Sequence, residues 1–155
     1  MNELGMKIKH AKKRGEWAEL KFMVAASERG FRVTKPWGET TQYDFVVEFG
    51  ENPSQKPHPV AKGATRMGHP ARRFVRVQVK STGFKDRGGY SCSVRGSGGA
   101  YVGDPFDFVA VYVVPEDVWY IIPEEVIRGR RSVAVYPGLK KSKYGKYKGA
   151  WKLMK

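Results

Sequence analysis

The stretch Arg76-Val77-Gln78-Val79-Lys80 decides the fold that we expect for this chain. Side chains alternate between the two faces of a strand, so the arginine, glutamine and lysine point one way and the valines the other. The valines stabilise the strand only if both faces are largely covered, and a polar Gln-x-Lys pair is then costly unless it has a function. We therefore interpret Gln78 and Lys80 as functional residues on a central strand.

A helix is expected over residues 15–29, which are rich in Ala, Glu, Leu and Met and are followed by Gly30, a residue typical of helix ends. At about 100° per residue, Glu19 falls on the apolar side of this helix, close to Phe22 and Met23. An inward-facing carboxylate needs a cation, either a lysine or arginine or a metal ion. We favour a catalytic role for Glu19 over a purely structural ion pair.

Several further strands are expected from runs of β-branched and aromatic residues. They cover residues 31–33, 42–49, 90–95, 106–114 and 118–122. Asp44 is expected in the middle of its strand, where aspartate is disfavoured, so we treat it as a second functional carboxylate. Asp107 also falls within an apolar strand, and there we expect a structural hydrogen bond rather than catalysis.

The charge of the chain predicts a polyanionic partner. The 155 residues suffice for one domain with a substantial core, and the formal net charge is +14. Acidic residues are absent from 52–85 and from 126–155, and the second region contains the lysine-rich run 140–148. Such regions favour nucleic acid over a merely solvated surface, and Tyr144 and Tyr147 could lie on sugar or base surfaces.

Two segments are expected to lie outside the helices and strands. Residues 50–71 are rich in Pro and Gly and lack periodicity, so we predict a long mobile loop between two antiparallel strands. This loop is either a tolerated insertion or a basic arm that contacts DNA, and the sequence favours neither. Residues 137–155 are predicted to form a basic C-terminal tail.

Other classes of protein are disfavoured. No apolar run approaches the length of a membrane span, and the basic N-terminus lacks the apolar segment of a secretory signal. The single Cys92 excludes an internal disulfide and a cysteine-based zinc site. His10, His58 and His69 lack the spacing of metal ligands. We expect a cytoplasmic protein without membrane contact.

The order of a helix glutamate, a strand aspartate and Gln-x-Lys on the next strand resembles the PD-(D/E)XK nuclease superfamily. The chain resembles in particular small homing-type endonucleases associated with group I introns and their bacterial relatives, and more distantly Holliday-junction resolvases. The segments that carry the resemblance are 15–22, 35–38, 43–47, 77–82, and 106–109 with 118–123. It implies an α/β, restriction-endonuclease-like core with a central mixed β-sheet flanked by helices and an N-terminal helix first. We expect this domain to span residues 1–155.

The resemblance also assigns the site. It implies that Glu19, Asp44, Gln78 and Lys80 are catalytic, and that Asp44, Gln78, Glu19 and the Val79 carbonyl hold Mg²⁺. Gln78 departs from the superfamily pattern, which usually has Asp or Glu there. An amide oxygen still binds Mg²⁺, with one less negative charge. Lys80 would stabilise developing charge or take a proton from the attacking water.

The implied activity is Mg²⁺-dependent hydrolysis of phosphodiester bonds in double-stranded DNA, of the homing or restriction type. Because one site cuts one strand, we expect a homodimer or homotetramer. The alternatives are a structure-selective nuclease like the Holliday-junction resolvases, and a DNA-binding module that kept the fold and lost catalysis. The residues expected to contact DNA are Lys35, Lys62, Arg66, Arg72, Arg76, Ser81, Thr82, Lys140, Lys141 and Lys143.

Overall fold

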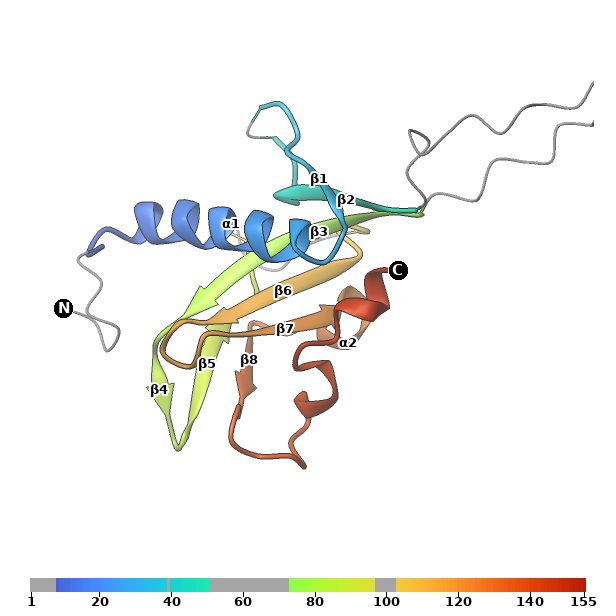
Figure 1. Cartoon of the computed structure of the whole chain (residues 1–155). Coiled ribbons are helices and arrows are strands. Elements are labelled where there is room, and N and C mark those ends of the chain that lie inside the picture. The colour runs from blue at the N-terminus through green and yellow to red at the C-terminus, as the bar shows by residue number, and fades with distance from the viewer. Residues whose placement is uncertain (1–7, 39, 51–72, 97–102) are drawn as a thin grey trace, which may run out of the picture.

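The structure, a computed structural model, is built on a mixed sheet of five strands (Figure 1). It describes residues 8–38, 40–50, 73–96 and 103–155. In spatial order the strands are β1 (Arg32–Thr34), β2 (Phe45–Phe49), β3 (Arg73–Thr82), β6 (Phe108–Val113) and β7 (Val118–Pro123). β3 and β6 are parallel, and the other neighbouring pairs are antiparallel. β3 is therefore the central strand, as its composition predicts.

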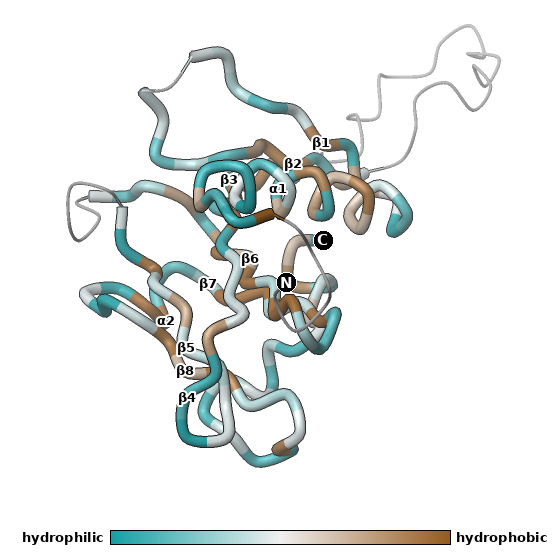
Figure 2. The backbone as a smooth tube through the Cα atoms, turned by 90° about the vertical axis from the view of Figure 1, so that its left-hand side faces the viewer, coloured by the Kyte–Doolittle hydropathy of each residue, from teal (hydrophilic) through white to brown (hydrophobic). Residues whose placement is uncertain are grey.

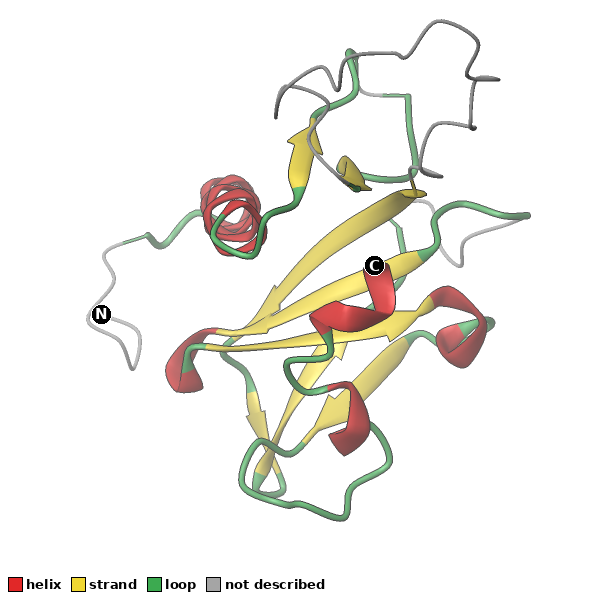
Figure 3. Ribbon diagram, turned by 45° about the vertical axis from the view of Figure 1, so that its right-hand side comes forward, coloured by secondary structure: helices red, strands yellow, loops and turns green. Residues whose placement is uncertain are grey.

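One long helix, α1 (Ala11–Ser27), covers one face of this sheet (Figures 1 and 3). It begins before the predicted start and ends ahead of Gly30, whose φ of +82° favours a residue without a side chain. Its buried residues Ala18, Phe22 and Ala26 recur at every fourth position, so they lie on one side of the helix. They pack in one core with the three valines of β3, which confirms the predicted orientation of that strand.

The opposite face of the central sheet is covered mainly by a second, three-stranded sheet (Figure 3). Its strands are β4 (Lys85–Asp86), β5 (Gly89–Ser93) and β8 (Ser132–Val135), in that order. The short helix α2 (Glu124–Ile127) follows β7 and contributes to the core between the two sheets. Only one face of the central sheet is thus covered by a long helix.

Strand β6 contributes to both cores because its side chains alternate between the faces. Ala110 and Tyr112 pack with α1, whereas Val109 and Val111 pack with the second sheet. All residues of the strand are buried, and a 3₁₀ turn, η1 (Val114–Glu116), connects it to β7. Figure 2 shows the hydrophobic stretches in the interior of the molecule and mostly hydrophilic loop tips around them.

Residues 137–155, which we predict to form a basic C-terminal tail, pack against the rest of the fold through several buried side chains. They contain two 3₁₀ turns, η2 (Gly145–Tyr147) and η3 (Trp151–Met154). Tyr144 and Tyr147 are only 4% and 8% exposed, because both pack between the two sheets. The prediction that these tyrosines lie on DNA is therefore wrong, although the lysines beside them stay exposed.

The predicted loop 50–71 lies almost entirely outside the described residues. The strands that it joins, β2 and β3, are antiparallel as predicted. Among the described residues, no helix has the length and apolar character needed to cross a membrane.

Candidate active site

Asp44 lies directly before β2 and closes the ladder between β2 and β3. Its N–H donates to the Val77 carbonyl at 2.9 Å, and its carboxylate Oδ2 accepts from the Val79 N–H at 2.7 Å. The carboxylate thus takes the place of a backbone carbonyl that β2 would otherwise offer to β3. Our prediction of a mid-strand aspartate is wrong on this point, because the strand begins only at the following residue, Phe45.

Asp44 lies where the paired part of β2 and β3 ends. The last pair of this ladder is Phe45 with Val77, and the hydrogen bonds of Asp44 to Val77 and Val79 hold it beside β3 just beyond that pair. Beyond this pair, β3 has no β2 partner among the described residues. Since the N–H and C=O of one strand residue point to the same neighbouring strand, the Val79 carbonyl faces this opening together with its N–H.

Burial raises the pKa of Asp44 from 3.8 to about 6. The hydrogen bond from Val79 opposes this rise, the nearby Glu19 carboxylate adds to it, and the ammonium groups of Lys80 and Lys35 lower the pKa. A carboxylate with a raised pKa carries its negative charge at a cost, which an added cation would reduce. The groups around Asp44 therefore neutralise its negative charge only in part, as expected for a carboxylate that binds a cation.

Glu19 reaches the same region from the middle of α1. Its Oε2 accepts a 2.7 Å hydrogen bond from Lys35 Nζ, and this bond is the main reason that the pKa of Lys35 is raised. The Glu19 side chain is 21% exposed and that of Lys35 is 62% exposed. From the sequence we expect a basic side chain or a metal ion beside Glu19, and Lys35 is such a basic side chain. Because Lys35 is largely exposed, the ion pair can open without disturbing the core.

Gln78 and Lys80 are half-buried on the β3 face turned away from α1, as their alternation with the valines predicts. Lys80 lowers the pKa of Asp44 and also opposes the rise in the pKa of the Cys92 thiol on β5, which burial raises to about 12. Its ammonium thus lies within electrostatic reach of both the Asp44 carboxylate and the second sheet.

A cavity of about 330 Å³ lies between α1 and the loop that joins β1 to β2. We call it the α1 pocket; Glu19 and Asp44 line it, and Lys12 and Lys35 bring positive charge to its wall. The other lining residues are Gly15, Glu16, Pro36, Gly38, Thr41 and Tyr43. With three carboxylates (Glu16, Glu19 and Asp44) and two ammonium groups (Lys12 and Lys35) on its walls, the pocket suits a polar, charged ligand better than an apolar one.

From the sequence we expect Lys35 to contact DNA, and its bond to Glu19 is a feature that this expectation misses. The available signal was its position directly after a strand that borders β2, close to the predicted aspartate. The structure therefore brings Glu19, Asp44 and Lys35 together around the α1 pocket. Lys80 acts on this group through its charge, and Gln78 lies two residues before Lys80 on the same strand.

The oxygen donors at this position fit a hard divalent cation such as Mg²⁺. Asp44 and Glu19 carry carboxylates, Gln78 carries an amide oxygen, and Val79 turns its carbonyl to the same opening. The described part of the chain has no group of three or more His, Cys, Asp or Glu residues able to hold a metal ion. A metal at this position would therefore depend on amide and carbonyl oxygens as well as on the two carboxylates.

Two residues expected to contact DNA are engaged within the fold. The Arg76 guanidinium bonds Asp104 at 2.8 Å and Asp107 at 3.1 Å, and its backbone N–H donates to Asp107 at 2.6 Å. Burial would raise the pKa of Asp107, but these hydrogen bonds outweigh it and lower the pKa. Asp107 thus has the expected structural role. Thr82 is buried and its hydroxyl donates to the Ser91 carbonyl at 2.5 Å. Both residues are thus engaged within the fold, and their contact with DNA stays a prediction.

The remaining residues expected to contact DNA stay predictions. Ser81 is half-buried, next to Thr82 at the end of β3. Lys140, Lys141 and Lys143 are exposed between β8 and η2. Three others, Lys62, Arg66 and Arg72, lie outside the described residues.

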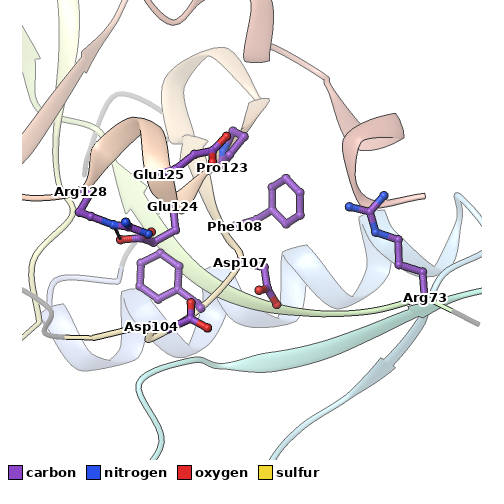
Figure 4. Close-up of a pocket in the computed structure, with 9 residues that line it drawn as sticks. Arg73, Asp104, Asp107, Phe108, Pro123, Glu124, Glu125 and Arg128 are labelled. Carbon is purple, nitrogen blue, oxygen red and sulfur yellow. Dashed lines mark hydrogen bonds and ion pairs between the residues drawn. The ribbon is translucent and has the colours of Figure 1, made fainter.

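A second cavity, of about 280 Å³, lies near the start of β6 and the end of β7 (Figure 4). Glu124 and Arg128 stand side by side there and form an ion pair of 2.6 Å. Asp104 and Asp107, which also line it, bond Arg76. Because these acidic and basic groups satisfy one another, we do not assign the reaction to this cavity.

The helix-first arrangement on a mixed sheet, with an acid and a Gln-x-Lys pair at its centre, is a nuclease-like α/β fold. The solved structure of a bacterial homing endonuclease, I-Ssp6803I, is similar to this chain with a TM-score of 0.66 and 23% sequence identity. The similarity covers 93% of this chain and 90% of that chain. No protein-family model and no curated protein matches the sequence. The comparison confirms the predicted fold class and the resemblance in fold to a homing-type endonuclease.

Proposed function

We propose that this protein is a metal-dependent endonuclease of the homing or restriction type that hydrolyses phosphodiester bonds in duplex DNA. The observation that carries the proposal is the half-buried Asp44 carboxylate, with its raised pKa and with Glu19, Lys35 and Lys80 around it. The fold shared with a bacterial homing endonuclease supports the same class of activity. The net charge of +14 supports a polyanionic substrate.

In this proposal Asp44, Glu19, Gln78 and the Val79 carbonyl hold Mg²⁺. The bound ion would neutralise charge on the scissile phosphate and make a nearby water more acidic. Asp44 is oriented by its 2.7 Å hydrogen bond from the Val79 N–H, which uses Oδ2 and leaves Oδ1 for a ligand. Glu19 serves as a ligand, directly or through water, once Lys35 releases it.

The two lysines at the site have different tasks. Lys80 lies close to Asp44 on the partly covered face of β3, where an ammonium stabilises charge that develops on the phosphate in the transition state. Lys35 is largely exposed and can exchange Glu19 for a phosphate of the bound strand. Lys35 would then position DNA, and Lys80 would act on the reacting group.

Cutting both strands of a duplex requires two such sites, so we propose a homodimer or homotetramer. Light scattering of the purified protein with and without duplex DNA tests this. A monomer in both conditions would restrict the activity to nicking.

The experiment that tests the function is incubation of the purified protein with plasmid and four-way-junction DNA, in Mg²⁺ and in EDTA. We expect cutting only in Mg²⁺, and its loss in both Asp44→Ala and Lys80→Ala, with DNA binding mostly retained. Asp86→Ala, at an exposed position on β4, is the matched control and should cut normally. Cutting that survives both substitutions would refute the site, and cutting in EDTA would refute metal dependence.

A second candidate function is DNA binding without catalysis. Two observations favour it: Gln78 stands where a carboxylate is usual in the superfamily that the chain resembles, and Lys35 already neutralises Glu19. It predicts that the wild-type protein binds duplex DNA and cuts neither substrate. Preferential cutting of the four-way junction would instead assign the structure-selective type of nuclease.

A further inference from the structure

Trp37 is fully exposed, at 100% of its reference area, in the loop between β1 and β2. Trp119 and Trp151, by contrast, are 7% and 6% exposed and belong to the core beneath α1. An indole in water contributes nothing to folding through burial, although aromatic side chains are among the largest contributors when they are covered. Trp37 is therefore a large apolar surface that the described residues leave uncovered.

The loop presents this side chain in a defined way. Pro36 fixes the backbone before it, and Gly38 follows with a φ of +87°, a conformation that favours glycine. Both neighbours of Trp37 line the α1 pocket, together with Glu19 and Asp44. Trp37 thus belongs to the loop that forms one wall of the pocket in which the proposed reaction takes place, and its indole is in solvent.

The charge around the pocket indicates what would cover the indole. Lys12 and Lys35 line this pocket together with three carboxylates, Glu16, Glu19 and Asp44, and the whole chain carries a net charge of +14. The two ammonium groups and the net charge of the chain attract a phosphate backbone, and a nucleotide held there presents its neighbouring bases to the β1–β2 loop. Aromatic side chains at such positions stack on bases with little sequence preference, because every base has a π-face.

We propose that Trp37 stacks on a nucleobase next to the phosphate held in the α1 pocket, and so positions the strand for cutting. The proposal rests on the proposed function, since it requires DNA at this site. Stacking on a base that leaves the duplex stack costs unstacking energy, which the contact with the indole offsets. Trp37 acts here as a positioning residue, and it leaves the chemistry to Asp44 and Lys80.

The test compares wild-type protein, Trp37→Ala and Trp37→Phe for binding to a 30-base-pair duplex of mixed sequence in EDTA. Removing a stacked aromatic should lower the affinity at least about fivefold, and phenylalanine should restore most of it. The slope of log affinity against log salt should stay unchanged in Trp37→Ala, because the substitution removes no cation that binds a phosphate. Phe84→Ala removes an aromatic side chain that is 71% exposed outside the pocket, and as the matched control it should bind normally.

A second readout follows the indole itself. In protein labelled with 5-fluorotryptophan, the ¹⁹F resonance of Trp37 is assigned by its loss in Trp37→Phe, and it should shift when the duplex is added. Normal binding by Trp37→Ala, or an unmoved resonance while the wild type binds, would overturn the stacking proposal and leave the proposed function intact. A wild type that does not bind the duplex would overturn both. A change of oligomeric state in Trp37→Ala would assign the indole to a second copy of the chain and overturn stacking.

Discussion

Replacing Asp44 with asparagine separates the hydrogen bond of this side chain from its charge. The asparagine Oδ1 can accept the Val79 N–H that Asp44 Oδ2 now accepts at 2.7 Å, so the end of the β2–β3 ladder is kept. The substitution removes a buried negative charge and its repulsion from Glu19. We expect Asp44→Asn to be more stable than the wild type at neutral pH without metal, and to be inactive in DNA cutting.

The magnitude follows from the pKa of Asp44, which burial raises from 3.8 to about 6. A rise of about two in pKa corresponds to about 3 kcal/mol of lost stability. Because the side chain is partly exposed, screening by water reduces the expected cost to about 1–2 kcal/mol. For a domain of this size, that corresponds to about 2–8 °C in melting temperature.

The sign depends on pH. Below pH 3.8, Asp44 is protonated in both the folded and the unfolded chain, and its charge costs nothing. Between 3.8 and about 6 the unfolded chain ionises first, so the stability of the wild type falls as the pH rises. Above about 6 the whole cost is present. The gain from Asp44→Asn should therefore be complete near pH 8 and vanish in acid.

The assay is thermal unfolding in EDTA across this pH range, with Asp86→Asn at an exposed position as control. The same measurement in excess Mg²⁺ should stabilise the wild type by about 3 kcal/mol at a hundredfold excess over the dissociation constant, and the variant by less. A variant that is less stable than the wild type at pH 8, or a gain that is independent of pH, would refute the reasoning.

The other predictions concern charges around the site. Gln78→Glu should tighten Mg²⁺ binding by about tenfold and preserve or raise cutting, measured by metal titration of the cutting rate; loss of activity would show that the amide itself is needed. Lys35→Gln should lower the Mg²⁺ concentration needed for cutting, because Glu19 is released, while DNA binding weakens. Asp107→Asn should cost about 1 kcal/mol at neutral pH in urea unfolding and little in acid, since the lowered pKa of Asp107 reflects its bond to Arg76. Replacing five exposed lysines together by alanine should flatten the salt dependence of DNA binding by about 0.9 for each lysine that binds a phosphate, and an unchanged slope would exclude them from the DNA surface. They are Lys140, Lys141, Lys143, Lys146 and Lys148.

Regular periodicity is the part of this fold that the sequence predicts well. The alternation of β3 places Gln78 and Lys80 on one face and the valines on the other, and the structure confirms both sides. The apolar spacing of α1 identifies its buried side in the same way. Both patterns depend only on local geometry, which explains why the faces of this strand and the buried side of this helix could be predicted without knowledge of distant contacts.

Contacts between segments far apart in the chain could not be read from the sequence. The hydrogen bond from Val79 to Asp44 exists because β2 begins one residue later, and strand ends depend on pairing with a distant partner. Arg76 meets Asp104 and Asp107 only through the parallel alignment of β3 with β6. No local pattern distinguishes such an arginine from one that is free to bind DNA.

The C-terminal segment contained a signal that its charge obscured. Its four buried residues Tyr144, Tyr147, Trp151 and Met154 are spaced by three, four and three positions, which is the spacing of one face of a helix. The lysines between them dominate the composition and suggest a solvated tail. The spacing predicts the structure of this segment better than its charge does. Burial of a few large apolar side chains stabilises the segment more than the many exposed charges destabilise it.

The site is close to neutral in its present state, and this balance explains why the predictions for Gln78 and Lys35 diverge. Asp44 and Glu19 carry two negative charges, and Lys35 and Lys80 carry two positive ones. A divalent cation alone would leave an excess of positive charge, which a DNA phosphate would offset. Metal and DNA should therefore favour each other's binding, and this coupling is the same whichever binds first.

Gln78→Glu supplies the missing negative charge from the protein, so it should strengthen metal binding without DNA and weaken the coupling. Lys35→Gln also favours the metal, but it removes a group that binds phosphate, so its effects on metal and DNA should be opposite.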